Sequence, residues 1–506
     1  MKRLVINSLI IAVIFTLSAF SSCSKKDDQE REISIIEVWL NTTQLTLEIG
    51  EIETLVLYFD PYEATDKTVT WESSNETVAT VTDGIIEAKA LGTANIKVTT
   101  NEGGHFAICV VTVIEVPNNY TEPPAVTMRS IKSGEVIIFM AGSGTITIDW
   151  GDGSPKETKT LLAADEELLN INTRDKFSYK HNYTGTYTRT IAITGDNITH
   201  LYCYNNELTH LDVSSNEPLV DLRCYNNRIA NLDVTNNTEL KILNCGNNRI
   251  EILNLSYNSE LIALYCNDNL FTVLDMSFNP ALQELGSSNN QLAFLIVSNC
   301  TELLWLDCSN NQLTSVNVSN NPDLLYLYCY ENLLTDLNLS NNTALLELSC
   351  SDNQISSLTF TNNVELERIN CGNNKIESLD LSGNIALRTL NCYNNQLVNL
   401  NISNNANLIY LYCDFNQLES LDVSSNAKLN ELYCDANNLT ALDLSNNANL
   451  NALGSSKNDF TADALNALFE TLHSNAGNKT IYIGDNPGTV DCDDSIATDK
   501  GWDVIR

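Results

Sequence analysis

The sequence predicts a mainly β protein: two N-terminal β-sandwiches, then a solenoid of 21-residue repeats, then a small α/β cap at the C-terminus. Three observations predict this fold. Short runs of alternating apolar and polar residues, separated by turn clusters, occupy residues 33–197. A 21-residue period without insertions fills residues 198–458, and residues 459–506 leave that period and show helical spacing.

The composition is that of a folded and strongly acidic chain. It has 506 residues, 43% of them hydrophobic, which is enough for several buried cores. The 64 Asp+Glu outnumber the 28 Lys+Arg, and the formal charge of −36 repels phosphate backbones and argues against a nucleic-acid partner. Five histidines and four methionines leave few candidates for imidazole catalysis or soft-metal chemistry, so we expect no cofactor. Fifteen cysteines need an explanation.

Residues 1–22 have the pattern of a signal peptide. Lys2 and Arg3 precede a mostly apolar run that ends at Leu17, and small residues follow it. A transmembrane helix is the alternative, but the run is short for a hydrocarbon layer of about 30 Å.

Small residues directly before Cys23 resemble the lipobox of bacterial lipoproteins, and the acidic stretch at 23–32 is similar to the surface-export tag of Bacteroidetes lipoproteins. The resemblance implies lipid attachment at Cys23 and anchoring in the outer membrane with the chain exposed on the cell surface. An ordinary secreted protein, and an anchor that faces the periplasm, stay open as alternatives.

Residues 33–116 alternate as the strands of a sandwich do. They contain, in the order of bacterial Ig-like group 2 domains, Ala64-Thr65, Val69-Thr70-Trp71, Ser73-Ser74-Asn75, Val78-Ala79-Thr80-Val81 and Gly92-Thr93-Ala94. The segment resembles that family over its whole length. The resemblance implies that Trp71 is a core residue and that Cys109 is a buried strand thiol.

Prolines in residues 117–125 interrupt the sheet pattern and mark a linker. In residues 126–197, the run from Ile148 to Ser154 and the tyrosine-rich run after Tyr179 look like the two halves of a polycystic-kidney-disease (PKD) type sandwich. Asp149 and Asp152 offer oxygen ligands for Ca²⁺. We favour an Asp-Gly turn stabilised by side-chain-to-backbone hydrogen bonds, which needs no ion.

The repeats of residues 198–458 keep one phase through three columns. The first is Cys203, Cys224, Cys245, Cys266, Ser287, Cys308, Cys329, Cys350, Cys371, Cys392, Cys413, Cys434 and Ser455. Asn stands three residues after each of these positions, and a second Asn column, broken only by Cys300, stands thirteen residues after each of the first twelve. Leucine or another large apolar residue fills most of the inward positions between them.

This pattern resembles leucine-rich repeats, and its nested form is similar to the bacterial IRREKO subclass. A repeat of this length forms a solenoid, because each coil buries its apolar face only against its neighbours. We expect the Asn amides to donate and accept hydrogen bonds within buried bends. A further column of Asp and Asn, such as Asp233, favours bend-stabilising hydrogen bonds over ion binding.

The cysteine column predicts free, poorly reactive thiols. Stacked parallel strands lie about 4.8 Å apart, so neighbouring thiols project in one line and cannot form a tetrahedral metal site. Parallel Cβ vectors argue against disulfides, although the Cα spacing would allow them. After Asn458, helical spacing over 462–473 and the turn at 484–488 predict a cap over the open end of the solenoid.

Side chains just before and after each ladder cysteine point outward by the two-residue alternation of a strand. The predicted ligand-binding face consists of Tyr202, Tyr204, Tyr225, Tyr265, Trp305, Asp307, Tyr326, Tyr328, Tyr330, Tyr393, Tyr410, Tyr412 and Tyr433. Aromatic rings with a polar tip recur at recognition surfaces. The alternative is that the tyrosines only stabilise the sheet through cross-strand contacts.

These observations favour a non-catalytic, surface-anchored recognition or adhesion protein that binds a host or bacterial protein through this face. A glycan-binding accessory lipoprotein of a polysaccharide-uptake system is the alternative. An enzyme is disfavoured, because the sequence contains no HExxH, GxSxG, phosphate-loop or dinucleotide motif.

Overall fold

The computed structural model describes residues 34–48, 52–61, 64–114, 123–165, 168, 174–185, 187–195 and 197–506, which fall into two compact units, residues 1–120 and 121–506. The predicted signal peptide, the export tag and Cys23 lie outside the described residues, as does most of the predicted linker. Within the part that is described, no helix has the length and apolar character needed to cross a membrane.

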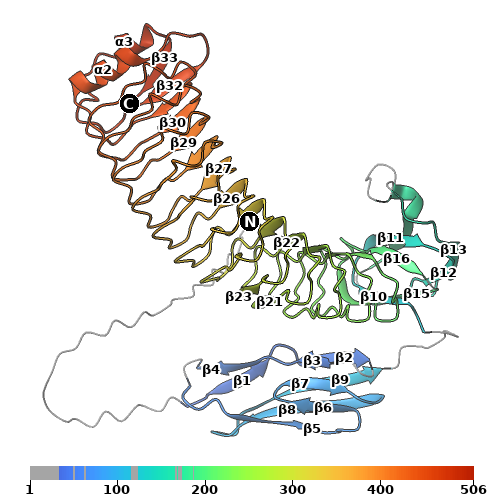
Figure 1. Ribbon diagram of the computed structural model, residues 1–506. Coiled ribbons are helices and arrows are strands. Elements are labelled where there is room, and N and C mark those ends of the chain that lie inside the picture. The colour runs from blue at the N-terminus through green and yellow to red at the C-terminus, as the bar shows by residue number, and fades with distance from the viewer. Residues whose placement is uncertain are drawn as a thin grey trace, which may run out of the picture. The chain divides into compact units, whose positions relative to one another are not determined.

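The first unit is the Ig-like sandwich (Figure 1). Its sheets are β1-β4, β2-β9-β8-β5 and β3-β7-β6. Its strands are β1 (Glu37–Leu40), β2 (Gln44–Glu48), β3 (Ile52–Thr54), β4 (Leu57–Asp60), β5 (Val69–Ser73), β6 (Ala79–Thr82), β7 (Ile85–Ala88), β8 (Gly92–Thr100) and β9 (Phe106–Ile114). Alternating residues such as Ile96, Val98 and Val111 fill the core. Cys109 is fully buried, as the resemblance implied. Trp71, expected as a core residue, is partly buried and packs against the edge of the core.

The second unit begins with two facing sheets that continue into the solenoid. One has the order β13-β12-β15-β10-β17, and the other starts with β11-β14-β16 and runs on through the repeats as one sheet of 17 strands. The strands are β10 (Val126–Ser130), β11 (Gly134–Gly142), β12 (Thr145–Asp149), β13 (Glu157–Thr160), β14 (Ser178–Tyr183), β15 (Arg189–Thr194), β16 (Ile198–Tyr202) and β17 (Leu208–Asp212), with the short 3-10 helix η1 (Arg174–Phe177) before β14. One core joins Met128, Ile138 and Ile191 to the leucines of the coils, so the region predicted as a separate sandwich also closes the front end of the solenoid.

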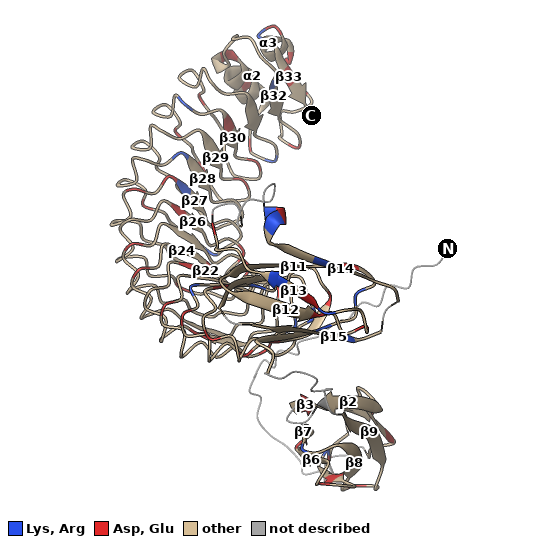
Figure 2. Cartoon of the chain, turned by 90° about the vertical axis from the view of Figure 1, so that its right-hand side faces the viewer, with Lys and Arg blue, Asp and Glu red and all other residues tan. Residues whose placement is uncertain are grey.

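Each coil then adds one short parallel strand to the long sheet. The strands are β18 (Asp221–Arg223), β19 (Ile242–Asn244), β20 (Ala263–Tyr265), β22 (Glu284–Gly286), β24 (Trp305–Asp307), β25 (Tyr326–Tyr328), β26 (Glu347–Ser349), β27 (Arg368–Asn370), β28 (Thr389–Asn391), β29 (Tyr410–Tyr412), β30 (Glu431–Tyr433) and β31 (Ala452–Gly454). Neighbouring partners are 21 residues apart throughout, as in Leu306 to Leu327. The coils therefore stack in strict phase, and Figure 2 shows the strands following one side of a bent rod. Two further strands, β21 (Val273–Asp275) and β23 (Phe294–Ile296), pair elsewhere on the coils.

The C-terminal cap continues the sheet and covers its last coil. After β31 come α2 (Ala462–Thr471), β32 (Lys479–Tyr482), α3 (Ser495–Thr498) and β33 (Trp502–Ile505), and β32 and β33 extend the parallel ladder. The Thr461 hydroxyl caps α2 by accepting a hydrogen bond from the Ala464 amide at 3.2 Å. Leu465, Leu468 and Phe469 of α2 face the core and cover the apolar end of the rod.

The first Asn column uses both ends of its amide, as expected. Asn332 Nδ2 donates to the carbonyls of Cys308, one coil earlier, and of Cys329 in its own coil, at 3.0 and 3.2 Å. Its Oδ1 accepts from the Leu313 amide at 3.0 Å. Each such side chain therefore bonds two consecutive coils together where the backbone has left the ladder.

For the second Asn column, the expectation of an accepted hydrogen bond is wrong. Asn342 Nδ2 donates to Val318 O at 2.9 Å and Asn321 O at 2.8 Å, but its Oδ1 is buried without a partner among the described residues, as it is along most of the column. This bend uses only the donor end of the amide, which bonds two backbone carbonyls. Cys300 fits the same column because its thiol donates to Met276 O at 3.5 Å.

The cysteine column is a ladder of free and fully buried thiols. Burial raises the pKa of Cys245 and of Cys371 to about 12. Where serine replaces cysteine, its hydroxyl reaches the next coil: Ser287 Oγ donates to Asp307 O at 3.2 Å. The ladder thus acts as small core side chains, as the sequence predicted.

The remaining carboxylates of interest cap turns. Asp233 Oδ1 accepts from the amide and the hydroxyl of Thr235, at 2.9 and 2.7 Å, and the pattern recurs along the column. Asp149 and Asp152 each accept a backbone amide two residues on, at 3.0 Å, and Asp152 also contacts His181 Nε2 at 2.7 Å. The turn interpretation of both sets is confirmed.

Candidate recognition face

The strand face is defined by three outward positions in each coil, namely three residues before, one before and one after the ladder residue. In the coil of Cys329 these are Tyr326, Tyr328 and Tyr330. The structure places twelve of the thirteen predicted residues on this face, each half-buried: Tyr204, Tyr225, Tyr265, Trp305, Asp307, Tyr326, Tyr328, Tyr330, Tyr393, Tyr410, Tyr412 and Tyr433.

Tyr202 is the exception, because it is buried and cannot meet a ligand. Only 2% of the residue is exposed, and it packs against Phe139, Leu168 and Phe177. Its hydroxyl donates to Asp221 Oδ2 at 2.8 Å. Burial, and to a smaller extent the negative charge of Asp221, raise the pKa of Tyr202. The segment before β14 covers the first coil, an overlap that the repeat pattern does not encode.

The remaining rings contact one another across coils. Tyr204 and Tyr225 stack with ring centroids 4.5 Å apart, and Tyr412 and Tyr433 stack at 5.6 Å. Trp305 meets Tyr328 edge-on at 6.4 Å. Such contacts hold the rings in place before any ligand arrives.

Several tyrosine hydroxyls bind carboxylates of the following coil. Tyr412 donates to Glu431 Oε2 at 2.8 Å, and Tyr265 donates to Glu284 Oε2. Burial and then this hydrogen bond raise the pKa of Tyr265 to about 12. Both tyrosines stand one residue before a ladder cysteine and pair with an acid 19 residues later.

Glycines on the face make room for neighbouring rings. A Cβ added at Gly372 would collide with the Tyr393 ring, and one at Gly454 would collide with Tyr433 and Asp435. The absence of a side chain at these positions therefore leaves the space that the neighbouring side chains occupy.

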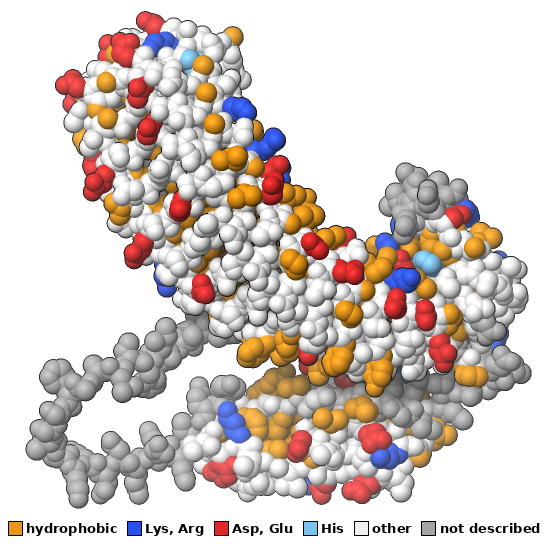
Figure 3. Space-filling view, in the orientation of Figure 1, with side chains coloured by type: hydrophobic (Ala, Val, Ile, Leu, Met, Phe, Trp, Pro, Cys, Tyr) orange, Lys and Arg blue, Asp and Glu red, His pale blue; other side chains and the backbone are white. Residues whose placement is uncertain are grey.

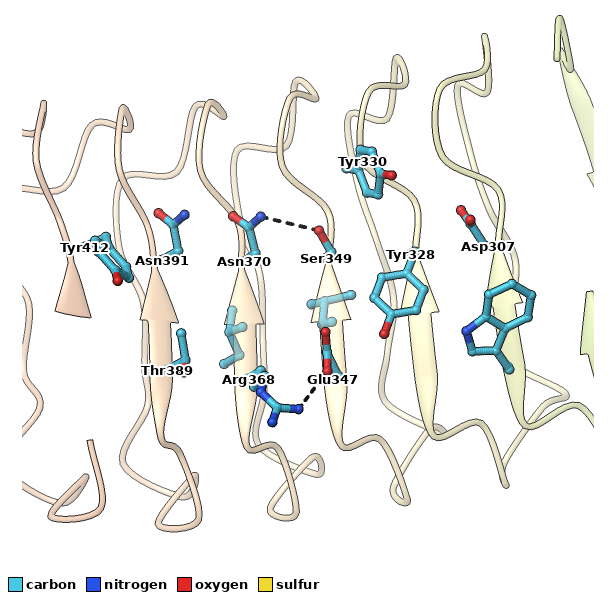
Figure 4. A pocket seen from close by; sticks show the side chains of 13 residues that line it. Asp307, Tyr328, Tyr330, Glu347, Ser349, Arg368, Asn370, Thr389, Asn391 and Tyr412 are labelled. Atoms are coloured by element: carbon cyan, nitrogen blue, oxygen red, sulfur yellow. Dashed lines mark hydrogen bonds and ion pairs between the residues drawn. The ribbon is translucent and has the colours of Figure 1, made fainter. Parts of the chain in front are cut away.

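A hollow of about 520 Å³ crosses the middle of the face, and we call it the polar trough. Figure 4 shows Tyr328 and Tyr330 toward one end, Tyr412 at the other, and smaller polar side chains between them. Trp305 also lines this hollow. The floor is formed by β26, β27 and β28 with Glu347, Ser349, Arg368, Asn370, Thr389 and Asn391. The repeat pattern does not single out the polar residues of this floor; the sequence signal at this place is the scarcity of aromatic residues between Ser349 and Asn391.

A second hollow, of about 420 Å³, adjoins the trough and shares Tyr412 with it. Asp414 and Asp435 line it with Tyr433 and Lys457, and burial raises the pKa of both carboxyls. Asp435 Oδ1 accepts the Ser456 amide at 2.7 Å. This hollow therefore holds two partly buried carboxyls beside the aromatic rings.

A third hollow, of about 750 Å³, lies near the front of the face. Asp221 and Arg223 form an ion pair of 2.9 Å there, and Tyr265 with Glu284 forms its far wall. Within the described ranges, no group of three or more His, Cys, Asp or Glu is arranged to hold a metal ion.

An exposed apolar patch lies on the coils that carry β21 and β23 (Figure 3). Ile252, Val273 and Phe294 occupy one column in three consecutive coils, with exposed fractions of 82%, 50% and 65%. Asn231 and Ser315 hold that column in the coils on either side. Unlike the tyrosines of the strand face, Ile252, Val273 and Phe294 carry no polar group.

The fold and the face together define a leucine-rich-repeat protein with an N-terminal Ig-like domain. Solenoids of this kind offer an extended curved surface for recognition. The likeness of 126–197 to PKD domains, and of the repeat to the IRREKO subclass, stays a prediction.

Comparison with known proteins supports both the Ig-like domain and the leucine-rich-repeat solenoid. Residues 37–111 match the bacterial Ig-like domain (group 2) family. An Ig-like virion protein of Serratia phage KSP90 is 39% identical over 83 residues, covering 16% of this chain and 32% of that protein. An uncharacterized protein of Clostridium acetobutylicum is 33% identical over 116 residues, covering 22% and 28%. The chain thus spans about a third or less of the length of these relatives.

The solenoid is similar to two solved structures from Listeria monocytogenes. The functional domain of InlJ, which includes a cysteine ladder, is 30% identical with a TM-score of 0.53, covering 60% of this chain and 72% of that one. The internalin InlF of strain 4b F2365 is 22% identical with a TM-score of 0.50, covering 61% and 86%, and this likeness shows the fold alone.

Proposed function

We propose that this chain is a non-catalytic adhesion or recognition protein, held at the cell surface by a lipid on Cys23, which binds a protein ligand through its strand face. The leucine-rich-repeat and Ig-like architecture supports an interaction role, as does the likeness to InlJ. The Ig-like and PKD-like modules then act as spacers between the outer membrane and the solenoid.

One observation carries the proposal. The inward columns of leucine, cysteine and asparagine are nearly fixed, whereas the three outward positions vary and collect half-buried aromatic rings. A fold that needed tyrosine only for sheet stability would distribute it evenly, but Tyr326, Tyr328 and Tyr330 crowd one coil and Ser349 and Ser351 follow in the next. Large rings with restricted motion bind at low entropic cost.

The charge of the chain indicates the kind of partner. With a formal charge of −36, the protein attracts surfaces that carry excess lysine and arginine and speeds their encounter. The face spans strands from β18 to β31, an extent that suits a protein better than a small molecule.

The test is capture of a partner by the purified protein from a host mucus or tissue extract, identified by mass spectrometry. We expect a specific protein that is lost with a triple variant, Tyr326→Ala, Tyr410→Ala and Tyr433→Ala. A matched triple change away from the face, Asn320→Ala, Asn341→Ala and Asn362→Ala, should retain it. Equal loss with both variants would contradict binding through the strand face.

The anchor has its own test. Metabolic labelling with a palmitate analogue should mark the wild-type protein and not Cys23→Ala, and protease added to intact cells should remove the solenoid. Labelling that persists in Cys23→Ala would refute the lipid site. A glycan-binding accessory lipoprotein is the alternative function, and saturable sugar binding with no protein partner would replace the proposal.

A further inference from the structure

The polar trough has walls and a floor of different chemistry. Tyr328 at one end and Tyr412 at the other present half-buried rings, and Trp305 braces Tyr328 edge-on at 6.4 Å. Tyr412 is fixed from two sides, by stacking on Tyr433 and by its hydrogen bond to Glu431. Rings held in this way can pack against the apolar face of a ligand with little loss of entropy.

The floor offers neutral hydrogen-bonding groups that the protein itself hardly uses. Asn370 Nδ2 makes only long contacts to the hydroxyls of Ser349 and Ser351, at 3.4 and 3.5 Å. Asn391 Oδ1 accepts the Tyr393 amide at 3.3 Å. Across the residues that the structure describes, Asn391 Nδ2 and the Thr389 hydroxyl have no hydrogen-bond partner, so a donor and a hydroxyl face the trough.

Charge in the floor is cancelled locally. The single cation, Arg368, pairs with Glu347 at 3.0 Å. Asp307, at the wall, already accepts the amide and hydroxyl of Ser309 at 3.0 and 2.6 Å. Asp414 and Asp435 line the adjoining hollow and not the trough. With Asp307 and Glu347 against the one cation Arg368, the trough lining carries one net negative charge, which disfavours an anionic occupant.

The spacing separates two kinds of extended ligand. Four coil intervals separate β25 from β29, or about 19 Å at about 4.8 Å per strand. The spacing of about 4.8 Å between neighbouring strands is close to the advance per pyranose residue in an extended glycan. Side chains on one side of an extended peptide recur at about 6.8 Å, which does not match the row Ser349, Asn370, Asn391.

We propose that the polar trough is a subsite for an extended, uncharged oligosaccharide of about four residues. The rings of Tyr328 and Tyr412 pack on sugar faces at the two ends, and Asn370, Asn391 and Thr389 bond the hydroxyls between them. This inference rests on the proposed function only in placing recognition on the strand face.

The test is isothermal titration calorimetry of the purified protein with four neutral hexasaccharides, of β-1,4-glucose, β-1,4-xylose, β-1,4-mannose and α-1,4-glucose. Heparin hexasaccharide and hexalysine are the charged arms. We expect saturable binding of at least one neutral sugar. Tyr328→Ala and Tyr412→Ala should each weaken it about tenfold or more.

The chain provides a matched control for each change. Tyr326→Ala and Tyr410→Ala alter a half-buried tyrosine on the same strands, β25 and β29, outside the trough. They should leave sugar affinity within about twofold. Tyr412→Phe keeps the ring and should retain most of the affinity even where Tyr412→Ala perturbs the sheet.

Three outcomes would overturn the subsite: no neutral hexasaccharide binds, only heparin or hexalysine binds, or the control variants lose affinity as much as the trough variants. Protein capture that depends on Tyr326, Tyr410 and Tyr433 would stand in each case, so the two proposals fail separately.

Discussion

The Tyr412 hydroxyl donates a hydrogen bond of 2.8 Å to the Glu431 carboxylate in the next coil. Tyr265 donates to Glu284 Oε2 over the same sequence separation. The hydroxyl of such a tyrosine is therefore occupied within the sheet, and its ring is what a ligand can meet. Recognition by these residues depends on ring faces more than on phenol hydrogen bonds.

We predict that Tyr412→Phe lowers the free energy of unfolding by about 0.5–1.5 kcal/mol, since one hydrogen bond to a half-exposed carboxylate is lost. Urea unfolding measures it. A double-mutant cycle with Glu431→Ala, which removes the acceptor, should return most of that energy as coupling, whereas Tyr410→Phe should show none with Glu431→Ala. Absence of coupling in the first cycle would mean that the pair does not stabilise the sheet.

The sequence periodicity predicted which residues of each coil contact the neighbouring coils. Leucine, cysteine and the first Asn column lie where the 21-residue phase put them, because identical coils can stack only with identical groups in register. Tyr202 was wrongly placed on the surface since Phe139, Leu168 and Phe177, which cover it, stand outside the period. The trough floor was missed for another reason: Ser349, Asn370 and Asn391 are common polar residues, and only their position between distant rings gives them a role.

The two Asn columns should respond differently to cysteine. Asn332→Cys removes both an accepted and a donated hydrogen bond and should cost on the order of 1–3 kcal/mol. Asn342→Cys should cost at least about 1 kcal/mol less, since that column needs only a donor and Cys300 already supplies it with a thiol. The urea midpoints of the two variants give their losses of stability. Equal losses would contradict the difference between the two Asn columns.

Native thiols should resist alkylation. Every cysteine in the described ranges is buried, and desolvation raises the pKa of the ladder thiols, so little thiolate is available. With iodoacetamide at pH 8 we expect slow labelling that becomes rapid in guanidinium chloride. Peptide mapping should find Cys492 first, at 7% exposed, before any ladder cysteine at 0%. Early labelling of Cys245 or Cys371 without denaturant would show that the coils open.

The same thiols predict a loss of stability at high pH. In the folded chain the pKa of Cys245 and of Cys371 is raised from 9.0 to about 12, so between these values the native state keeps a proton that the unfolded state has lost. The contribution is complete below pH 9 and disappears as the pH rises toward 12, at up to about 1.4 kcal/mol per thiol and pH unit. Urea midpoints at pH 7, 9, 10 and 11 should therefore fall steeply above pH 9.

The variant Cys245→Ala, Cys371→Ala should be less stable at pH 7, because each change leaves a small cavity, but its midpoint should fall less steeply with pH. Since lysines, arginines and tyrosines are the same in both proteins, an unchanged slope would mean that the ladder thiols do not control the alkaline transition.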